Sequence, residues 1–196
     1  MTTDPAHAST AAALAEHQDL AFRVEPLLPR IAEVAGLLIE TFERGGRVYT
    51  FGNGGSSVDA NHFSEELVGR FERERRPLPA LSLASDSAAL TCIANDYSFE
   101  EVFERQVRAF VREGDVTIAF STSGRSPNVV RGLAAAKGLG AATVLFGGGL
   151  GDGGPAAAHA DHLLVVPSES TARIQELHVF FLHCVVDAVD AWAAGE

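Results

Sequence analysis

The sequence has 196 residues, of which 46% are hydrophobic and 21% are charged, a size that suits one domain with a well-buried core. A formal net charge of −11 excludes a broadly basic surface, so we expect no nucleic-acid or membrane partner. The first twenty residues carry Asp4 and Glu16 and lack an uninterrupted apolar core, and we expect no apolar run of membrane-spanning length. Cys92 and Cys184 lie far apart in apolar segments, which favours a reduced, cytoplasmic protein.

The chain begins with a helical pattern from about residue 8 to residue 44. Apolar side chains recur there at three- and four-residue steps and form one stripe: Ile31, Val34, Leu38 and Phe42. Because proline breaks a helix interior, we expect Pro26 and Pro29 to divide this region into two helices. Residues 1–44 are therefore predicted to be an N-terminal helical extension.

After Gly45 and Gly46 the pattern changes to short β-rich runs that alternate with helical stretches. The predicted strands span residues 47–51, 80–83, 115–121, 141–146 and 162–166, and the predicted helices span 58–70, 99–112, 128–139 and 171–193. This alternation predicts a doubly wound α/β domain over residues 45–196, built on a five-stranded, mainly parallel sheet. The run 147–154 is too glycine-rich for regular structure and is predicted to be a mobile loop or a tight turn.

Two loops that follow predicted strands have the composition of anion-binding loops. The first, Gly52-Asn53-Gly54-Gly55-Ser56-Ser57, combines backbone freedom with hydroxyl donors just before a helix. The other, residues 121–126, carries four hydroxyls in six residues. Neither loop has the ending of a nucleoside-triphosphate cradle or the pattern of a dinucleotide fingerprint. A small phosphorylated metabolite fits better, although helix caps and solvated turns use the same residues.

Polar side chains with metal-ligating chemistry lie on two predicted helices. His62 and Glu66 are four residues apart, so they share a helix face with Cβ atoms about 6 Å apart, although an ordinary surface contact has the same spacing. Gln175, His178 and His183 lie in the apolar last helix, where polar groups need partners. Gln175 and His183 are separated by roughly 12 Å along the helix, which permits a shared ion without requiring one. On spacing alone, His178 is a rival ligand or a packed histidine.

The motifs together resemble the phosphoheptose isomerases, also called sedoheptulose 7-phosphate isomerases, of the sugar-isomerase (SIS) superfamily. The residues that carry the resemblance keep their order over about residues 45–190: Gly52-Asn53-Gly54-Gly55-Ser56, Asp59-Ala60-Asn61-His62-Phe63, Glu65-Glu66-Leu67, Gly69-Arg70, Asn95-Asp96-Tyr97, Ser121-Thr122-Ser123-Gly124, and Arg173-Ile174-Gln175-Glu176-Leu177-His178 with His183.

The resemblance implies a zinc site and a set of substrate contacts. The implied zinc ligands are His62, Glu66, Gln175 and His183. The implied substrate-binding residues are Asn53, Gly54, Gly55, Ser56, Glu66, Asn95, Asp96, Ser121, Thr122, Ser123, Ser126 and Gln175. Family members are typically homotetramers with active sites near subunit interfaces, and the N-terminal helices join that assembly.

The family reaction interconverts sedoheptulose 7-phosphate and D-glycero-D-manno-heptose 7-phosphate and feeds activated-heptose biosynthesis. This aldose–ketose exchange passes through an enediol and needs one group for the carbon-bound proton and another for the oxygens. With the family as guide, we assign Glu66 as the base at carbon and His183 as the acid at oxygen.

Three positions depart from the family pattern. Ala172 stands where an Asp is usual, which puts the sugar's identity in question more than the reaction type, and Ser57 and Arg125 replace a frequent His and Asn. Arg125 is either a further phosphate contact or a solvated loop residue. The alternatives are a non-catalytic SIS regulator that associates with a replication initiator, and an isomerase of another ketose phosphate. The complete set of implied metal ligands favours the enzyme.

Overall fold

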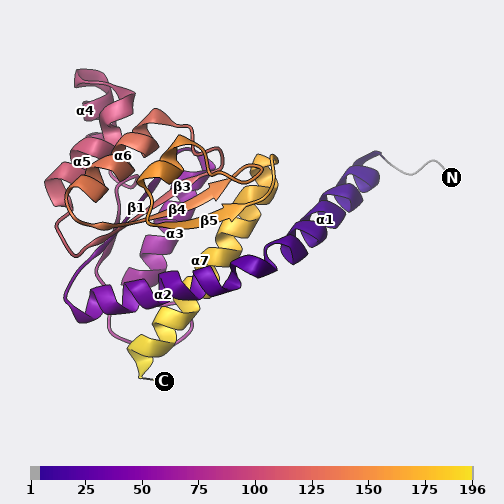
Figure 1. Ribbon diagram of the computed structural model, residues 1–196, viewed down its shortest axis with the longest axis horizontal. Helices are drawn as coiled ribbons and strands as arrows, with labels where there is room; N and C mark the ends of the chain where they lie inside the picture. Colours follow the sequence, from indigo (N-terminus) through magenta and orange to yellow (C-terminus); the bar gives the residue numbers. More distant parts are fainter. Residues whose placement is uncertain (1–4, 196) are drawn as a thin grey trace.

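The computed structural model describes residues 5–195, and within this range five strands form one parallel sheet in the order β2-β1-β3-β4-β5 (Figure 1). The strands are β1 (Val48–Gly52), β2 (Ala80–Ser82), β3 (Val116–Ser121), β4 (Ala142–Gly148) and β5 (His162–Val166). Every predicted strand is present with ends that agree within two residues, and all four strand pairings are parallel. The predicted doubly wound α/β fold is confirmed.

Helices cover both faces of the sheet because the strands are apolar on both sides. On one face, α2 (Leu28–Glu43), α3 (Gly55–Val68) and α7 (Thr171–Ala194) share a core with inward-facing strand residues such as Ile118 and Phe120. On the other, α5 (Val102–Phe110) and α6 (Pro127–Gly138) pack on residues such as Ala119. This alternation along β3 follows the two-residue period of a strand.

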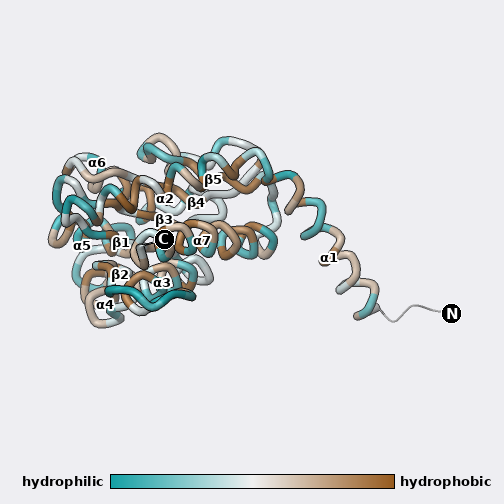
Figure 2. The backbone as a smooth tube through the Cα atoms, turned by 90° about the horizontal axis from the view of Figure 1, so that it is seen from below, coloured by the Kyte–Doolittle hydropathy of each residue, from teal (hydrophilic) through white to brown (hydrophobic). Residues whose placement is uncertain are grey.

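The predicted N-terminal helices are present and divided as expected. Helix α1 (Pro5–Arg23) is followed by a 3₁₀ turn, η1 (Glu25–Leu27), and then by α2. Pro29 lies in the first turn of α2, where a missing N–H costs nothing. Figures 1 and 2 show α1 extending away from the body of the molecule. Residues 1–4 of the predicted extension and residue 196 of the predicted domain lie outside the described range.

Two segments between strands differ from the prediction. Helix α4 (Ser87–Asp96) was not predicted. None of its residues is fully buried, and its apolar residues Leu90, Ile93 and Ala94 are only partly buried where they pack on the core. Asp86 caps the helix by accepting from the N–H groups of Ala88 and Ala89. The prediction of irregular structure for the whole glycine run was wrong, because Gly147 and Gly148 complete β4. A Cβ at Gly148 would lie 2.5 Å from the Thr122 carbonyl oxygen, so close packing requires glycine there.

Helix α7 corrects the expectation that no segment reaches membrane-spanning length. Its 24 residues are long and apolar enough by length and composition alone. The helix nevertheless packs on α2 and α3 and buries nine residues along its length, including Ile174 and Phe181. Its apolar composition is therefore explained by its place in the core.

Candidate functional site

The first glycine loop makes a tight turn from β1 into α3. Gly54 has φ +55°, a backbone conformation that side chains with a Cβ rarely adopt. A Cβ at Gly52 would lie 2.5 Å from the Ser56 carbonyl oxygen. A Cβ at Gly55 would collide with the side-chain amide of Gln175, which approaches from α7. The glycines thus allow α7 to reach the N-terminus of α3, where free N–H groups favour an anion.

The serine-rich loop joins β3 to α6 and is ordered by its own hydroxyl groups. The Gly124 N–H donates to Ser121 Oγ at 3.1 Å, and the Arg125 N–H donates to Ser123 Oγ at 3.2 Å. Gly124 has φ +60°, and a Cβ there would collide with the backbone oxygen of Gly153. The loop therefore lies directly against the glycine-rich segment that follows β4.

Both loops open into one cavity of about 250 Å³. Its lining contains most of the predicted substrate-binding residues: Asn53, Gly55, Ser56, Ser121, Thr122, Ser123, Ser126 and Gln175. Phe120 and Thr171 complete the lining. Thr171 was not predicted, although a hydroxyl on the first residue of the last helix was a signal that could have suggested it. A larger hollow of about 660 Å³ adjoins the cavity through shared residues and includes Arg125 in its lining.

Asn128 is a further residue that the sequence did not single out. Its buried side chain forms two reciprocal amide hydrogen bonds with Asn53, at 2.8 Å and 2.9 Å. Asn128 Oδ1 also accepts from the Val129 N–H at 2.9 Å. This pair joins the glycine loop to the start of α6 and fixes the orientation of Asn53 beside the cavity.

His62, Glu66 and His183 come together between α3 and α7. One ligand atom from each residue lies within 4.8 Å of the others. His62 Nε2 is 3.2 Å from Glu66 Oε1, and the rings of His62 and His183 meet edge-on with centroids 5.1 Å apart. The predicted pairing of a carboxylate and an imidazole on α3 with an imidazole on α7 is therefore present in the folded chain.

The surroundings of this group are part apolar and part polar. Phe71 stacks on the His183 ring with centroids 5.4 Å apart. Asp59, one turn before His62 on α3, is buried; burial raises the pKa of its carboxyl to about 6, although the nearby His62 opposes this. Among the described residues, Asp59 Oδ2 has no hydrogen-bond partner. The Asp59 carboxyl is therefore a buried acidic group on α3, one turn before His62, in addition to the partly buried Glu66.

The structure separates the roles of Gln175 and His178. Gln175 lies against Gly55 and lines the cavity. His178 is fully buried, and its Nε2 donates to the Gly147 carbonyl oxygen at 2.9 Å. Burial lowers the pKa of His178 to about 4 despite that bond, so the ring is neutral. His178 thus fits the packed histidine of the two readings left open by its spacing.

Asn95 and Asp96 do not line this cavity. They lie at the end of α4 and are exposed, with Asn95 Nδ2 donating to Asp96 Oδ1 at 2.8 Å. Asp96 also accepts from the Cys92 thiol at 3.5 Å. Within a single chain these two predicted substrate contacts are therefore apart from the other residues of the site.

Comparison with known proteins identifies the family. The SIS domain family model matches residues 14–148. A phosphoheptose isomerase of Aquifex aeolicus is 48% identical over 171 residues, which is 87% of this chain and 88% of the relative. Solved structures of phosphoheptose isomerases from Francisella tularensis (TM-score 0.91, 34% identity, 95% of this chain and 99% of that one) and Neisseria gonorrhoeae (TM-score 0.88, 38% identity, 94% and 98%) are similar throughout.

The matched family range begins inside α1 and so includes residues on both sides of the predicted boundary at residue 44. The division into an extension and a domain consequently stays a prediction. Identity close to one half over nearly the whole length of both chains, together with the shared fold, exceeds what the common SIS architecture alone would give. The protein belongs to the phosphoheptose isomerase family of SIS-domain proteins.

Proposed function

We propose that this protein isomerises sedoheptulose 7-phosphate to D-glycero-D-manno-heptose 7-phosphate for activated-heptose biosynthesis. The observation that carries the proposal is the cluster of His62, Glu66 and His183 on the same two helices that border the hydroxyl-lined cavity. Such a site offers both groups that an aldose–ketose exchange needs, a proton carrier and a polar group beside the sugar oxygens. The names and the 48% identity of the relatives support the same substrate.

In this reaction Glu66 takes the proton from one of the two reacting carbons and returns it to the other. His183 donates a proton to the carbonyl oxygen as the enediol forms and accepts one from the neighbouring hydroxyl as it collapses, so that no proton is gained or lost. The Glu66 side chain is only 14% exposed, which limits exchange of its proton with water. The hydroxyls of residues 121–126 and the amides at the start of α3 bind the phosphate and hold the sugar chain against these two groups.

The ligand atoms present fit a zinc ion. Two imidazoles and one carboxylate are donors that zinc accepts, and ligands about 2.1 Å from a tetrahedral ion are about 3.4 Å apart. The 3.2 Å between His62 Nε2 and Glu66 Oε1 matches that separation. Gln175 is proposed as the fourth ligand. When bound, the metal polarises the sugar carbonyl and stabilises negative charge on its oxygen.

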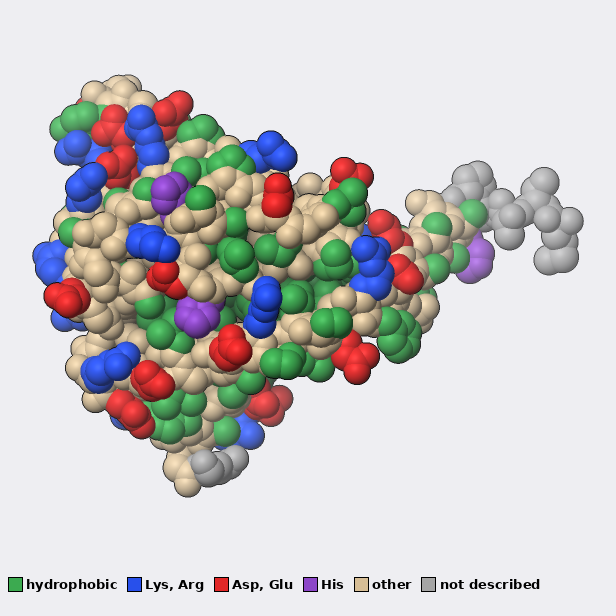
Figure 3. Space-filling view, viewed as in Figure 1, with side chains coloured by type: hydrophobic (Ala, Val, Ile, Leu, Met, Phe, Trp, Pro, Cys, Tyr) green, Lys and Arg blue, Asp and Glu red, His purple; other side chains and the backbone are tan. Residues whose placement is uncertain are grey.

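The remaining contacts point to an assembly. Asn95 and Asp96 are exposed on α4, so we propose that they reach the active site of a neighbouring subunit in a homotetramer that α1 also joins. Figure 3 shows acidic and basic side chains interspersed on the face in view, which agrees with a small anionic substrate held by local groups. The proposed location is the cytoplasm, where sugar phosphates are made.

The test is a coupled assay with sedoheptulose 7-phosphate before and after chelation and with Glu66→Gln. Turnover that is lost on chelation, restored by zinc and absent in Glu66→Gln supports the proposal. Retained turnover in Glu66→Gln would remove its assigned role. Turnover with another ketose phosphate, but not with sedoheptulose 7-phosphate, would support the isomerase reaction and contradict the proposed sugar. The departure at Ala172 is the reason to include such substrates. Phosphosugar binding without any turnover would point to a regulator.

A further inference from the structure

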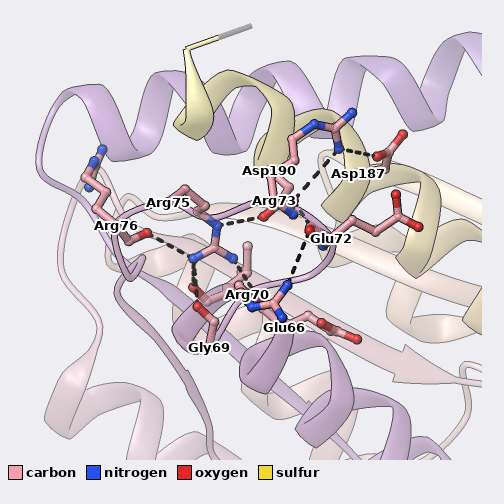
Figure 4. Close-up of polar contacts among 10 residues, drawn as sticks. Glu66, Gly69, Arg70, Glu72, Arg73, Arg75, Arg76, Asp187 and Asp190 are labelled. Carbon is pink, nitrogen blue, oxygen red and sulfur yellow. Dashed lines mark hydrogen bonds and ion pairs between the residues drawn. The ribbon is translucent and has the colours of Figure 1, made fainter.

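The loop of residues 69–79, which joins α3 to β2, contacts both proposed catalytic residues. At its start, Phe71 stacks on the His183 ring. Further along, Arg75 Nη2 donates to the backbone carbonyl oxygen of Glu66 at 2.6 Å. Figure 4 shows this loop lying between the end of α3 and the last turns of α7. One loop thus touches a residue of each helix that contributes to the metal cluster.

Arg75 caps the C-terminal end of α3. Besides Glu66, its guanidinium donates to the carbonyl oxygens of Leu67 at 2.9 Å and Gly69 at 3.1 Å. The last carbonyls of a helix have no partner within the helix and carry partial negative charge, so a cation there is stabilising. The planar guanidinium has enough donors in fixed directions to bind several of these oxygens together.

Asp190 on α7 holds the other side of the same guanidinium. Arg75 Nε donates to Asp190 Oδ1 at 2.8 Å, and both side chains are fully buried. Asp190 Oδ2 accepts from the backbone N–H groups of Glu72 at 3.1 Å and Arg73 at 2.7 Å. Burial alone would raise the pKa of Asp190, but these hydrogen bonds outweigh it and lower the pKa, so the carboxylate is charged.

Arg75 and Asp190 are each linked to one of the proposed catalytic residues, Glu66 and His183. Asp190 follows His183 by seven residues, two turns along one face of α7, while Arg75 binds the backbone of Glu66 itself. The rotation of α3 against α7 decides whether the Glu66 carboxylate and the His183 imidazole are close enough to share an ion. A relative movement of α3 and α7 would separate Arg75 from Asp190 and leave a buried charge without its partner. Because an unpaired buried charge is strongly destabilising, the pair resists such a movement.

We propose that Arg75 is a positioning residue which, through Asp190, holds Glu66 on α3 at the ion-sharing distance from His183 on α7. The proposal rests on the proposed function, because it assumes that these two residues bind the metal and act on the substrate. It predicts that weakening the Arg75–Asp190 pair lowers metal affinity and turnover, and leaves phosphosugar binding intact, because the loops at residues 53–56 and 121–126 are not part of it.

The test uses two variants that keep the size of the side chains. Arg75→Lys retains the charge, but a compact ammonium cannot bind Asp190 and the α3 carbonyls together. Asp190→Asn retains the shape but turns an amide donor or a neutral oxygen toward Arg75. We expect either variant to weaken zinc binding by the apoprotein about tenfold, measured by competition with a chromophoric chelator, and to lower kcat by a similar factor. KM for the sugar phosphate should change by less than about twofold.

Two control variants separate positioning from stability. Val107→Ala on α5 creates a cavity in the core on the other face of the sheet and so lowers the thermal midpoint far from the metal cluster. Arg76→Met removes a charge from the same loop, where Arg76 stacks on Trp192. Both should bind zinc like the unchanged protein. If Arg75→Lys and Asp190→Asn lower the midpoint yet keep wild-type zinc affinity and kcat, the pair is only structural and the proposal is overturned. If the unchanged apoprotein binds no zinc, the metal assignment of the proposed function fails instead, and this proposal with it.

Discussion

Gly55 is the position where the structure makes its sharpest prediction, because one added methyl group should separate activity from stability. An ideal Cβ there would lie 2.9 Å from Gln175 Cδ and 3.0 Å from Gln175 Oε1. Since carbon atoms in contact prefer about 3.5–4.0 Å, the amide must withdraw by about 1 Å. Gln175 is a flexible side chain, so it can do so without disturbing the backbone.

The expected stability change of Gly55→Ala is small and favourable. Gly55 is the first residue of α3 and has an ordinary negative φ, so alanine fits its backbone. The loss of unfolded-state freedom then adds up to about 1 kcal/mol, which for a chain of this length raises the thermal midpoint by about 2–4 °C. A displacement of about 1 Å in a residue that binds the metal or substrate costs about 100-fold in turnover.

The assay compares kcat, zinc affinity and thermal midpoint with those of Gly36→Ala. Gly36 lies in α2, and apart from its chain neighbours and the backbone of its own helix, no atom of the described residues comes within 4 Å of its added Cβ. The control should gain stability and keep full activity. Should Gly55→Ala instead retain both turnover and zinc affinity, Gln175 would not need its observed position and its role as a ligand would be refuted.

Two further predictions concern buried polar residues. The unfolded chain protonates His178 below pH of about 6.5 and the folded chain only below about 4, so the free energy of unfolding should fall by up to about 3 kcal/mol as the pH drops through that window. Urea titrations of His178→Gln should lack this slope, and an equal slope in both proteins would contradict the burial argument. Asn128→Leu should raise KM about tenfold, because Asn53 loses both amide hydrogen bonds; an unchanged KM would show that Asn53 does not touch the substrate.

The strands and their loops could be predicted because their signals are local. Buried parallel strands such as β3 are apolar on both faces and therefore form uninterrupted runs. The loops after β1 and β3 are marked by glycine and hydroxyl residues whose chemistry depends little on the rest of the chain. The cavity that they line was accordingly anticipated from its residues, including Ser56 and Ser126.

The parts that were missed depend on tertiary contacts. Asn128 is an unremarkable helix residue until the fold brings it to Asn53, 75 positions away. The end of β4 was misread because Gly148 has to be glycine for Thr122 and Ile174 to approach it, a constraint that composition alone cannot show. The spacing of His178 left two readings open, and only its hydrogen bond to Gly147 distinguishes them.

The two halves of the site differ in how the fold holds them. The proposed phosphate end is formed by backbone and hydroxyl groups at the ends of β1 and β3, and every residue of β1 pairs with β3 in the sheet. The proposed metal end depends on side chains of α3 and α7, with Glu66 in the last turn of α3, so its geometry follows any rotation between these helices. Substitutions in the α3–α7 contact should therefore impair chemistry before binding, whereas substitutions in the loops should impair binding first. A comparison of kcat and KM for substitutions at several positions therefore tests the division of the site into a loop part that binds and a helix part that reacts.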